Sequence, residues 1–166
     1  MATSVRANVW ILADGCFRPK SSSRLRLLVV DDNVDAATSM GMVLELLGIE
    51  HMVEFSGEGA LTAVECFHPD AVLLDIGMPG MDGYEVARRL RTNPENADMT
   101  LIAVTGWSQL QDRQKTRAAG FDHHLSKLAD IGALQSMLAT LKPVSMTSSG
   151  SNDDERRSRD RRSATN

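Results

Sequence analysis

Short apolar runs alternate with segments of helical periodicity along the middle of this chain. The continuous aliphatic character of these runs is typical of strands that are covered on both faces. The expected strands are Leu25 to Val30, His51 to Phe55, Val72 to Leu74, Leu101 to Val104 and His123 to Leu125. Strands that alternate with helices predict crossover βαβ units, and therefore an α/β fold built on a parallel sheet.

Helix signals follow each of these runs. Gly48 ends the first helical pattern, Pro69 stops the second, and the turn from Pro79 to Gly83 precedes the third. The expected helices are Val34 to Leu47, Glu58 to Phe67, Tyr84 to Arg91, Gln109 to Ala119 and Asp130 to Leu141. An apolar stripe on the first helix is interpreted as core packing; it consists of Met40, Val43, Leu44 and Leu47.

The two ends of the chain differ from this pattern. With 166 residues and 42% hydrophobic content, the chain has room for one core, which we place in residues 24–142. Residues 1–23 and 143–166 lack apolar periodicity and are expected to be disordered. The arginine run from Arg156 to Arg162 could bind an acidic partner, but interleaved acids such as Asp154 and Asp160 offset it and favour a solvated tail.

Charge and cysteine content exclude several classes of protein. The 18 basic and 22 acidic residues give a net charge of −4, which argues against a general binder of nucleic acid or of anionic membranes. Cys16 and Cys66 are too few and too far apart for a disulfide framework or a zinc site. The apolar stretch from Val9 to Ala13 is too short for a secretory or membrane-spanning segment, so we expect a cytoplasmic protein.

Acidic and polar side chains follow the expected strands. Asp31 and Asp32 follow the first strand, Asp75 the third, Thr105 the fourth, and Ser126 with Lys127 the fifth. Because ligands of open parallel sheets bind at the carboxyl ends of the strands, these groups are expected to converge. Gathered carboxylates repel one another unless a cation neutralises them, and their oxygens suit Mg²⁺. An ammonium and a hydroxyl beside them suit the oxygens of a phosphoryl group.

A simpler interpretation exists for single residues of this set. Asp32 or Asn33 could cap the first helix and Asp82 the third, and taken singly the capping role is favoured for Asp32 and Asp82. Coincidence explains the joint pattern poorly; it comprises Asp31, Asp32, Asp75, Thr105 and Lys127.

Four motifs make residues 25–141 resemble a response-regulator receiver domain of two-component signalling. The motifs are Leu27-Leu28-Val29-Val30-Asp31-Asp32-Asn33, Val72-Leu73-Leu74-Asp75-Ile76-Gly77-Met78-Pro79-Gly80-Met81-Asp82-Gly83-Tyr84, Val104-Thr105-Gly106 and His124-Leu125-Ser126-Lys127. The resemblance implies a flavodoxin-like, doubly wound sheet of five parallel strands in the order 2-1-3-4-5, with five helices.

The resemblance also implies roles for the residues of the site. Asp75 would receive a phosphoryl group from a phosphohistidine on a sensor histidine kinase or a histidine phosphotransfer protein. Mg²⁺ would be held by Asp32, Asp75 and the Gly77 carbonyl, with Asp31 assisting through water. Slow self-dephosphorylation is expected, because the same site can position water; the chain is otherwise not expected to be an enzyme.

Two further residues complete the implied site, and two positions depart from the family. Lys127 would pair with Asp75 and then with the phosphoryl oxygens, and Thr105 would bond them in the activated state. His124 stands where the family usually has Tyr or Phe, which makes it a candidate switch residue. Leu128 stands where the family usually has proline, so a trans bond is expected after Lys127.

Several functions remain open from the sequence. The chain could be a switchable phosphoacceptor, a partner-binding pseudo-receiver, or a receiver segment of a hybrid histidine kinase. A dehalogenase-like phosphatase is disfavoured, because Gly77 stands where that class needs a second carboxylate. Output is expected to pass through protein contacts, without contact to nucleic acid or membrane. The resemblance to the family implies that the contact face is formed by the fourth helix, fifth strand and fifth helix, near Trp107 and His124.

Overall fold

A five-stranded parallel sheet forms the centre of the molecule. The computed structural model describes residues 25–106, 113–127 and 131–141. The strands are β1 (Arg26–Val30), β2 (Glu50–Glu54), β3 (Ala71–Asp75), β4 (Thr100–Thr105) and β5 (His123–Ser126). They pair in the order β2-β1-β3-β4-β5, which confirms the predicted flavodoxin-like topology.

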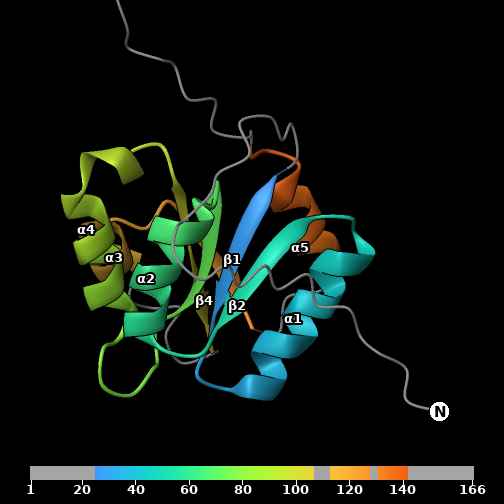
Figure 1. Ribbon diagram of the computed structural model, residues 1–166, viewed down its shortest axis with the longest axis horizontal. Helices are drawn as coiled ribbons and strands as arrows, with labels where there is room; N and C mark the ends of the chain where they lie inside the picture. The colour runs from blue at the N-terminus through green and yellow to red at the C-terminus, as the bar shows by residue number, and fades with distance from the viewer. Residues whose placement is uncertain (1–24, 107–112, 128–130, 142–166) are drawn as a thin grey trace, which may run out of the picture.

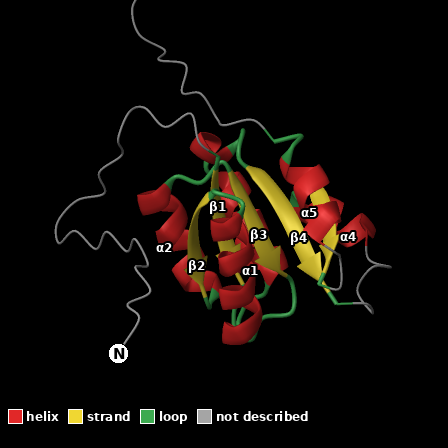
Figure 2. Ribbon diagram, turned by 90° about the vertical axis from the view of Figure 1, so that its right-hand side faces the viewer, coloured by secondary structure: helices red, strands yellow, loops and turns green. Residues whose placement is uncertain are grey.

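Helices cover both faces of the sheet. They are α1 (Val34–Leu46), α2 (Gly57–Phe67), α3 (Gly83–Thr92), α4 (Arg113–Ala119) and α5 (Ile131–Leu138), and a short 3₁₀ helix, η1 (Pro94–Asn96), follows α3. Figure 1 shows α2, α3 and α4 on one side of the sheet and α1 and α5 on the other. Figure 2 shows α1 crossing in front of neighbouring strands, which run side by side.

The alternation of side chains along the strands produces one apolar cluster on each face. Leu28 and Val30 of β1 pack with α2 and α3, whereas Leu27 and Val29 pack with α1 and α5. All four are at most 4% exposed, and burying one such side chain stabilises the fold by about 1.5–3 kcal/mol. The central strands are therefore fixed between two layers, and their carboxyl ends are held at one edge.

Each of the first three helices begins at a polar cap. The side chains of Asn33, Ser56 and Asp82 accept hydrogen bonds from backbone N–H groups in the first turns of α1, α2 and α3. The predicted cap at Asp82 is confirmed. The cap preferred for the first helix was wrong, because Asn33 and not Asp32 takes that position.

Some element boundaries differ from the prediction. The last helix was expected to reach Leu141 but ends at Leu138, because Thr140 and Leu141 donate their N–H groups three residues back in a tighter turn. The Asn93-Pro94 pair starts η1, which the sequence analysis missed. Residues 1–24, 107–112, 128–130 and 142–166 lie outside the described residues, and with them lie both predicted disordered ends, Cys16, Trp107, the expected start of the fourth helix and the Lys127-Leu128 bond.

Candidate functional site

The two central strands bring the acidic residues together. Val30 of β1 pairs with Leu74 of β3, so Asp31 and Asp75 follow at matching positions on neighbouring strands. The chain reverses its winding direction between these two strands, since β2 lies on the far side of β1 and β4 on the far side of β3. The acids therefore lie at the point where open α/β sheets bind their ligands.

Three carboxylates gather at this point. One ligand oxygen from each of Asp31, Asp32 and Asp75 lies within 4.8 Å of the others. Asp31 is 6% exposed and Asp75 is 4% exposed, whereas Asp32 is exposed to solvent. Carboxylates at this separation repel one another, and a hard divalent cation with oxygen ligands is the ion that relieves the repulsion best.

The three carboxylates differ in their protein partners. Asp31 accepts the Asn33 N–H at 2.9 Å on Oδ1, and its Oδ2 faces Lys127. Asp75 accepts the Gly77 N–H at 3.2 Å on Oδ1. No hydrogen bond or ion pair joins the Asp32 side chain to another residue within 25–106, 113–127 or 131–141. Asp32 is thus the carboxylate most available to a bound cation.

Lys127 supplies the positive charge of the site. Its ammonium Nζ lies 2.9 Å from Oδ2 of Asp75 and 2.9 Å from Oδ2 of Asp31. Its backbone N–H donates to the Thr105 carbonyl at 2.8 Å, which ties the turn after β5 to β4. Desolvation lowers the pKa of Lys127, but the hydrogen bonds and charges of Asp75 and Asp31 outweigh it, and the pKa lies above its ordinary value.

Thr105 lies on β4, the strand that neighbours Asp75 on β3, and His124 lies on β5, on the far side of β4. Thr105 ends β4, is fully buried, and its hydroxyl has no hydrogen-bond partner among the described residues. His124 pairs with Ala103 in the sheet, so its side chain lies on the same face as that of Thr105, two positions along the strand. His124 is half-buried there.

A tight loop after β3 carries Gly77. The Gly83 N–H donates to the Ile76 carbonyl at 3.1 Å and closes this loop before α3 begins. A Cβ atom at Gly83 would overlap the Asp75 carbonyl oxygen and lie 2.8 Å from Cα of Ile76. Only glycine fits this close approach, and the loop therefore holds the Gly77 backbone next to Asp75.

The end of β2 lies beside the acidic residues and contacts Asp31. The Asp31 N–H donates to the Glu54 carbonyl at 3.2 Å, which extends the β1–β2 ladder to the first acid of the site. Burial raises the pKa of the Glu54 carboxyl. The sequence analysis did not identify this contact, because its signal lies in the strand register and not in a motif.

A family comparison decides the identity of this arrangement. The model of the response regulator receiver domain family matches residues 27–139. This chain belongs to that family. Receivers of this family are signalling modules of two-component systems that interact with histidine kinases or phosphotransfer proteins, and they bind Mg²⁺ at an acidic pocket.

Relatives of the receiver occur both as small proteins and as parts of large ones. It is 32% identical over 108 residues to a 14.6 kDa protein of Leptolyngbya boryana, a match that covers 65% of this chain and 82% of that protein. It is 34% identical over 140 residues to the virulence sensor protein BvgS of Bordetella pertussis, covering 81% of this chain and 11% of BvgS. The chain thus spans only about a ninth of that sensor.

A solved structure supports the comparison of the sites. The receiver domain of a sensor histidine kinase from Pseudomonas aeruginosa is 29% identical, with a TM-score of 0.64, and the match covers 69% of this chain and 94% of that domain. That structure has a magnesium ion coordinated in its active-site cleft. Within the described residues of the present receiver, no helix has the length and apolar character needed to cross a membrane.

Proposed function

We propose that this receiver accepts a phosphoryl group on Asp75 from a phosphohistidine of a sensor histidine kinase or a histidine phosphotransfer protein. The observation that carries the proposal is the gathering of three carboxylates around Asp75 with the Lys127 ammonium 2.9 Å from its Oδ2. An oxygen of Asp75 forms a bond to phosphorus as the bond from phosphorus to the imidazole nitrogen breaks. The products are an acyl phosphate and a free histidine on the donor.

The carboxylates fit a resident Mg²⁺. Asp32, Asp75 and the Gly77 carbonyl would hold the ion, and Asp31 would contribute through water. The protein contacts support a direct role for Asp32, because its side chain has no such partner among the described residues, whereas both oxygens of Asp31 and of Asp75 face protein donors. When bound, the ion supplies positive charge that neutralises the oxygens of the transferred group.

The protein supplies the remaining contacts to the phosphoryl group. Lys127 neutralises a second phosphoryl oxygen, and its raised pKa keeps it protonated at neutral pH. The buried Thr105 hydroxyl donates to a third oxygen, which gives that hydroxyl the partner that it lacks among the described residues. His124 lies on the same face as Thr105 and acts as the switch residue, which changes its position when the Thr105 hydroxyl bonds the phosphoryl group.

The signal leaves through protein contacts on the face formed by α4, β5 and α5. We place no nucleic acid or membrane at this face, and we assign residues 24–142 to the receiver. Water positioned at the same site hydrolyses the acyl phosphate slowly, so the phosphorylated state has a limited lifetime.

Intact-mass analysis after incubation with acetyl phosphate and Mg²⁺ tests the proposal. One added phosphoryl group is expected on the wild type, and none on Asp75→Asn or on wild type with a metal chelator. Asp82→Asn is a matched control, because Asn also caps helices and Asp82 is outside the carboxylate group. Unmodified wild type, with acetyl phosphate and with a phosphohistidine donor, would favour a pseudo-receiver that only binds partners.

A second assignment concerns the protein in which the receiver operates. A receiver segment of a hybrid histidine kinase is favoured by the match to BvgS, which covers most of this chain and a small part of that sensor. Both assignments use the same chemistry at Asp75.

A further inference from the structure

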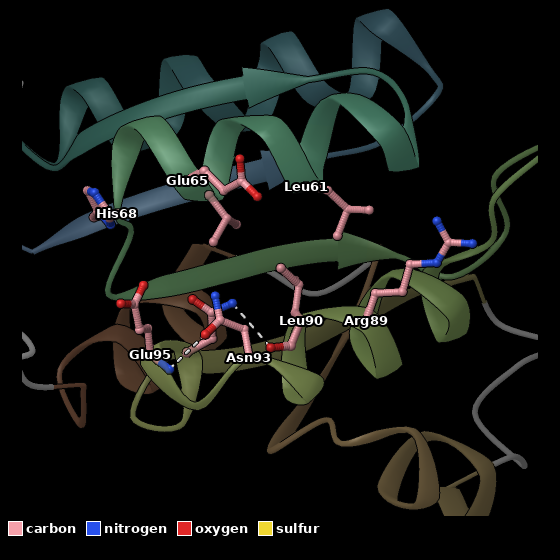
Figure 3. Close-up of a pocket in the computed structure, with 9 residues that line it drawn as sticks. Leu61, Glu65, His68, Arg89, Leu90, Asn93 and Glu95 are labelled. Atoms are coloured by element: carbon pink, nitrogen blue, oxygen red, sulfur yellow. Dashed lines mark hydrogen bonds between the residues drawn. The ribbon is translucent and has the colours of Figure 1, made fainter. Parts of the chain in front are cut away.

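A groove separates α2 from α3 and η1 on the face of the sheet opposite α1 (Figure 3). It encloses about 270 Å³. Its floor is apolar: Leu61 of α2 faces Leu90 of α3 across the groove, and the buried Val64 lies on the same side as Leu61. One end of the groove lies at the edge of the sheet where strands begin, because His68 follows the last turn of α2.

The rim of the groove carries negative charge. Glu65 of α2 and Glu95 of η1 are both exposed, and neither carboxylate has a hydrogen bond or ion pair to another residue of the described ranges. Arg89 also lines the groove, but its guanidinium Nε bonds Glu85 at 2.8 Å, and Figure 3 shows it at the opposite end from Glu95. The rim near η1 therefore presents two carboxylates with no lysine or arginine beside them in the described part of the chain, and the other titratable group at this end is the His68 imidazole.

An apolar floor between two carboxylates selects the chemistry of its occupant. Arginine combines an apolar stem, which packs along hydrophobic surface, with a planar guanidinium that forms paired hydrogen bonds to a carboxylate. A short segment with several arginines matches the groove better than a neutral or an acidic peptide does.

The chain itself carries such a segment. Residues 156–162 contain five arginines and one aspartate, a local charge of +4, and most of the acids that offset it precede the run at positions 153–155. Fourteen residues lie between Leu141 and Arg156. An intervening segment of this length spans about 20 Å as a flexible coil and at most about 50 Å when extended. A domain of about 100 residues has a radius of gyration of about 13 Å, so the run can reach the far face of the sheet. Leu141 follows α5 at the edge where the strands begin, which is also the edge of the groove.

We propose that the arginine run from Arg156 to Arg162 docks in the groove between α2 and η1, with its guanidinium groups on Glu65 and Glu95. Because the run is tethered, its effective concentration at the groove is of the order of millimolar, and a weak contact is therefore populated. The contact is electrostatic and is weakened by salt. The proposal does not depend on phosphorylation, because neither glutamate belongs to the carboxylate site.

Paramagnetic broadening in the full chain tests this contact. Cys66, an exposed cysteine on α2 beside Glu65, carries a nitroxide label in a Cys16→Ser background. The amide signals of residues 156–162 are expected to broaden. A control label is placed at Thr38→Cys in a chain whose two native cysteines are changed to serine. Thr38 is an exposed position of α1, on the other face of the sheet, and the label there is expected to leave these signals sharp.

Two changes are expected to remove the broadening caused by the Cys66 label. Glu65→Gln with Glu95→Gln removes both charges from the rim at exposed positions, and salt at about 1 M shortens the screening length to about 3 Å. A several-fold loss of broadening is expected in each case.

Three results would overturn the proposal. Equal broadening from the Cys66 and Thr38 labels would mean that the run samples both faces. Broadening that persists in the double glutamine variant would place the contact elsewhere. A mixed sample tests for contact between chains: one chain carries the isotope without nitroxide, and the other carries the nitroxide without isotope. Broadening of the signals of residues 156–162 in this sample would show that the run binds the groove of a second copy.

Discussion

The Lys127 ammonium lies 2.9 Å from Oδ2 of Asp75, and the same nitrogen lies 2.9 Å from Oδ2 of Asp31. A residue from the turn after β5 thereby joins the ends of β1 and β3. Since the Lys127 N–H also bonds the Thr105 carbonyl, four strands meet through one residue. When no cation is bound, the positive charge of Lys127 partly neutralises the negative charge of the carboxylates.

Replacing Lys127 by methionine is therefore expected to lower the free energy of unfolding by about 1–2 kcal/mol at pH 7, a value reduced from that of a buried pair because the ammonium is partly exposed. The folded pKa of Lys127 is raised, so its contribution is complete below the ordinary lysine pKa and is lost as pH rises through the higher folded value. Urea unfolding from pH 7 into this alkaline range measures the gap to wild type. A gap that stays constant with pH would indicate lost packing and not lost charge.

Asp32→Asn separates the repulsion among the three carboxylates, which destabilises the metal-free protein, from their binding of Mg²⁺. Removing one of three like charges is expected to raise the stability of the metal-free protein by roughly 0.5–1 kcal/mol. The same change is expected to abolish stabilisation by Mg²⁺, which for wild type amounts to about 1.4 kcal/mol at an ion concentration ten times Kd. Thermal unfolding with MgCl₂ or chelator measures both effects. Asp98→Asn, at an exposed position outside the carboxylate group, serves as the control, and it should respond to Mg²⁺ as wild type does.

Gly83→Ala tests the close approach that shapes the loop after β3. The added Cβ meets backbone atoms of Asp75 and Ile76, which cannot move aside as a side-chain end can. A loss of about 3 kcal/mol or more is expected from this overlap. Gly106→Ala is the matched control, because no atom of the described residues lies within 4 Å of its added Cβ, and it should cost less than about 0.5 kcal/mol. Equal denaturation midpoints for the two variants would contradict the argument.

Arg91 fixes the opposite edge of the sheet from the carboxylates. Its guanidinium donates to the carbonyls of Gly120, Asn96 and Met99 at 2.8–3.0 Å and to Asp122 Oδ2 at 2.6 Å. Asp122 also accepts the N–H of Leu101, the second residue of β4. This network connects α3, η1, β4 and the segment before β5.

Arg91→Ala is expected to lower the free energy of unfolding by about 2–4 kcal/mol, because three partly buried carbonyls and the Asp122 carboxylate lose their donor. Arg91→Lys should recover little, since one ammonium cannot reach the same set of acceptors. Arg88→Ala removes an exposed pair with Glu85 on the same helix and should cost less than about 0.5 kcal/mol. Chemical denaturation of the three variants provides the comparison, and a similar loss for Arg88→Ala and Arg91→Ala would refute the special role of Arg91.

The sequence allowed the fold to be predicted because its strands are buried on both faces. Runs such as Leu27 to Val30 leave no polar position for a solvent-facing side, and Gly48 and Pro69 end the helices between them. The acids at the strand ends followed from the same pattern. Asp31 and Asp75 were expected at one edge because β1 and β3 are parallel, and the register places them there.

Contacts between distant segments escaped prediction. The second contact of Lys127, to Asp31, depends on the path of the turn after β5. Arg91 looked like one of several arginines on α3, and only the fold brings Gly120 and Asp122 to its guanidinium. The capping role favoured for Asp32 was wrong, because Asp and Asn both cap helices well and only the backbone path decides that the Asn33 side chain turns back onto α1.

The most direct test of the central claim is to locate the phosphoryl group on the chain. Wild type is incubated with acetyl phosphate and Mg²⁺ and then reduced with borohydride, which converts an aspartyl phosphate to homoserine, and the peptides are sequenced by mass spectrometry. The account predicts homoserine at position 75 alone. Homoserine at position 31 or 32, or a phosphoryl group found only on a histidine, would contradict it.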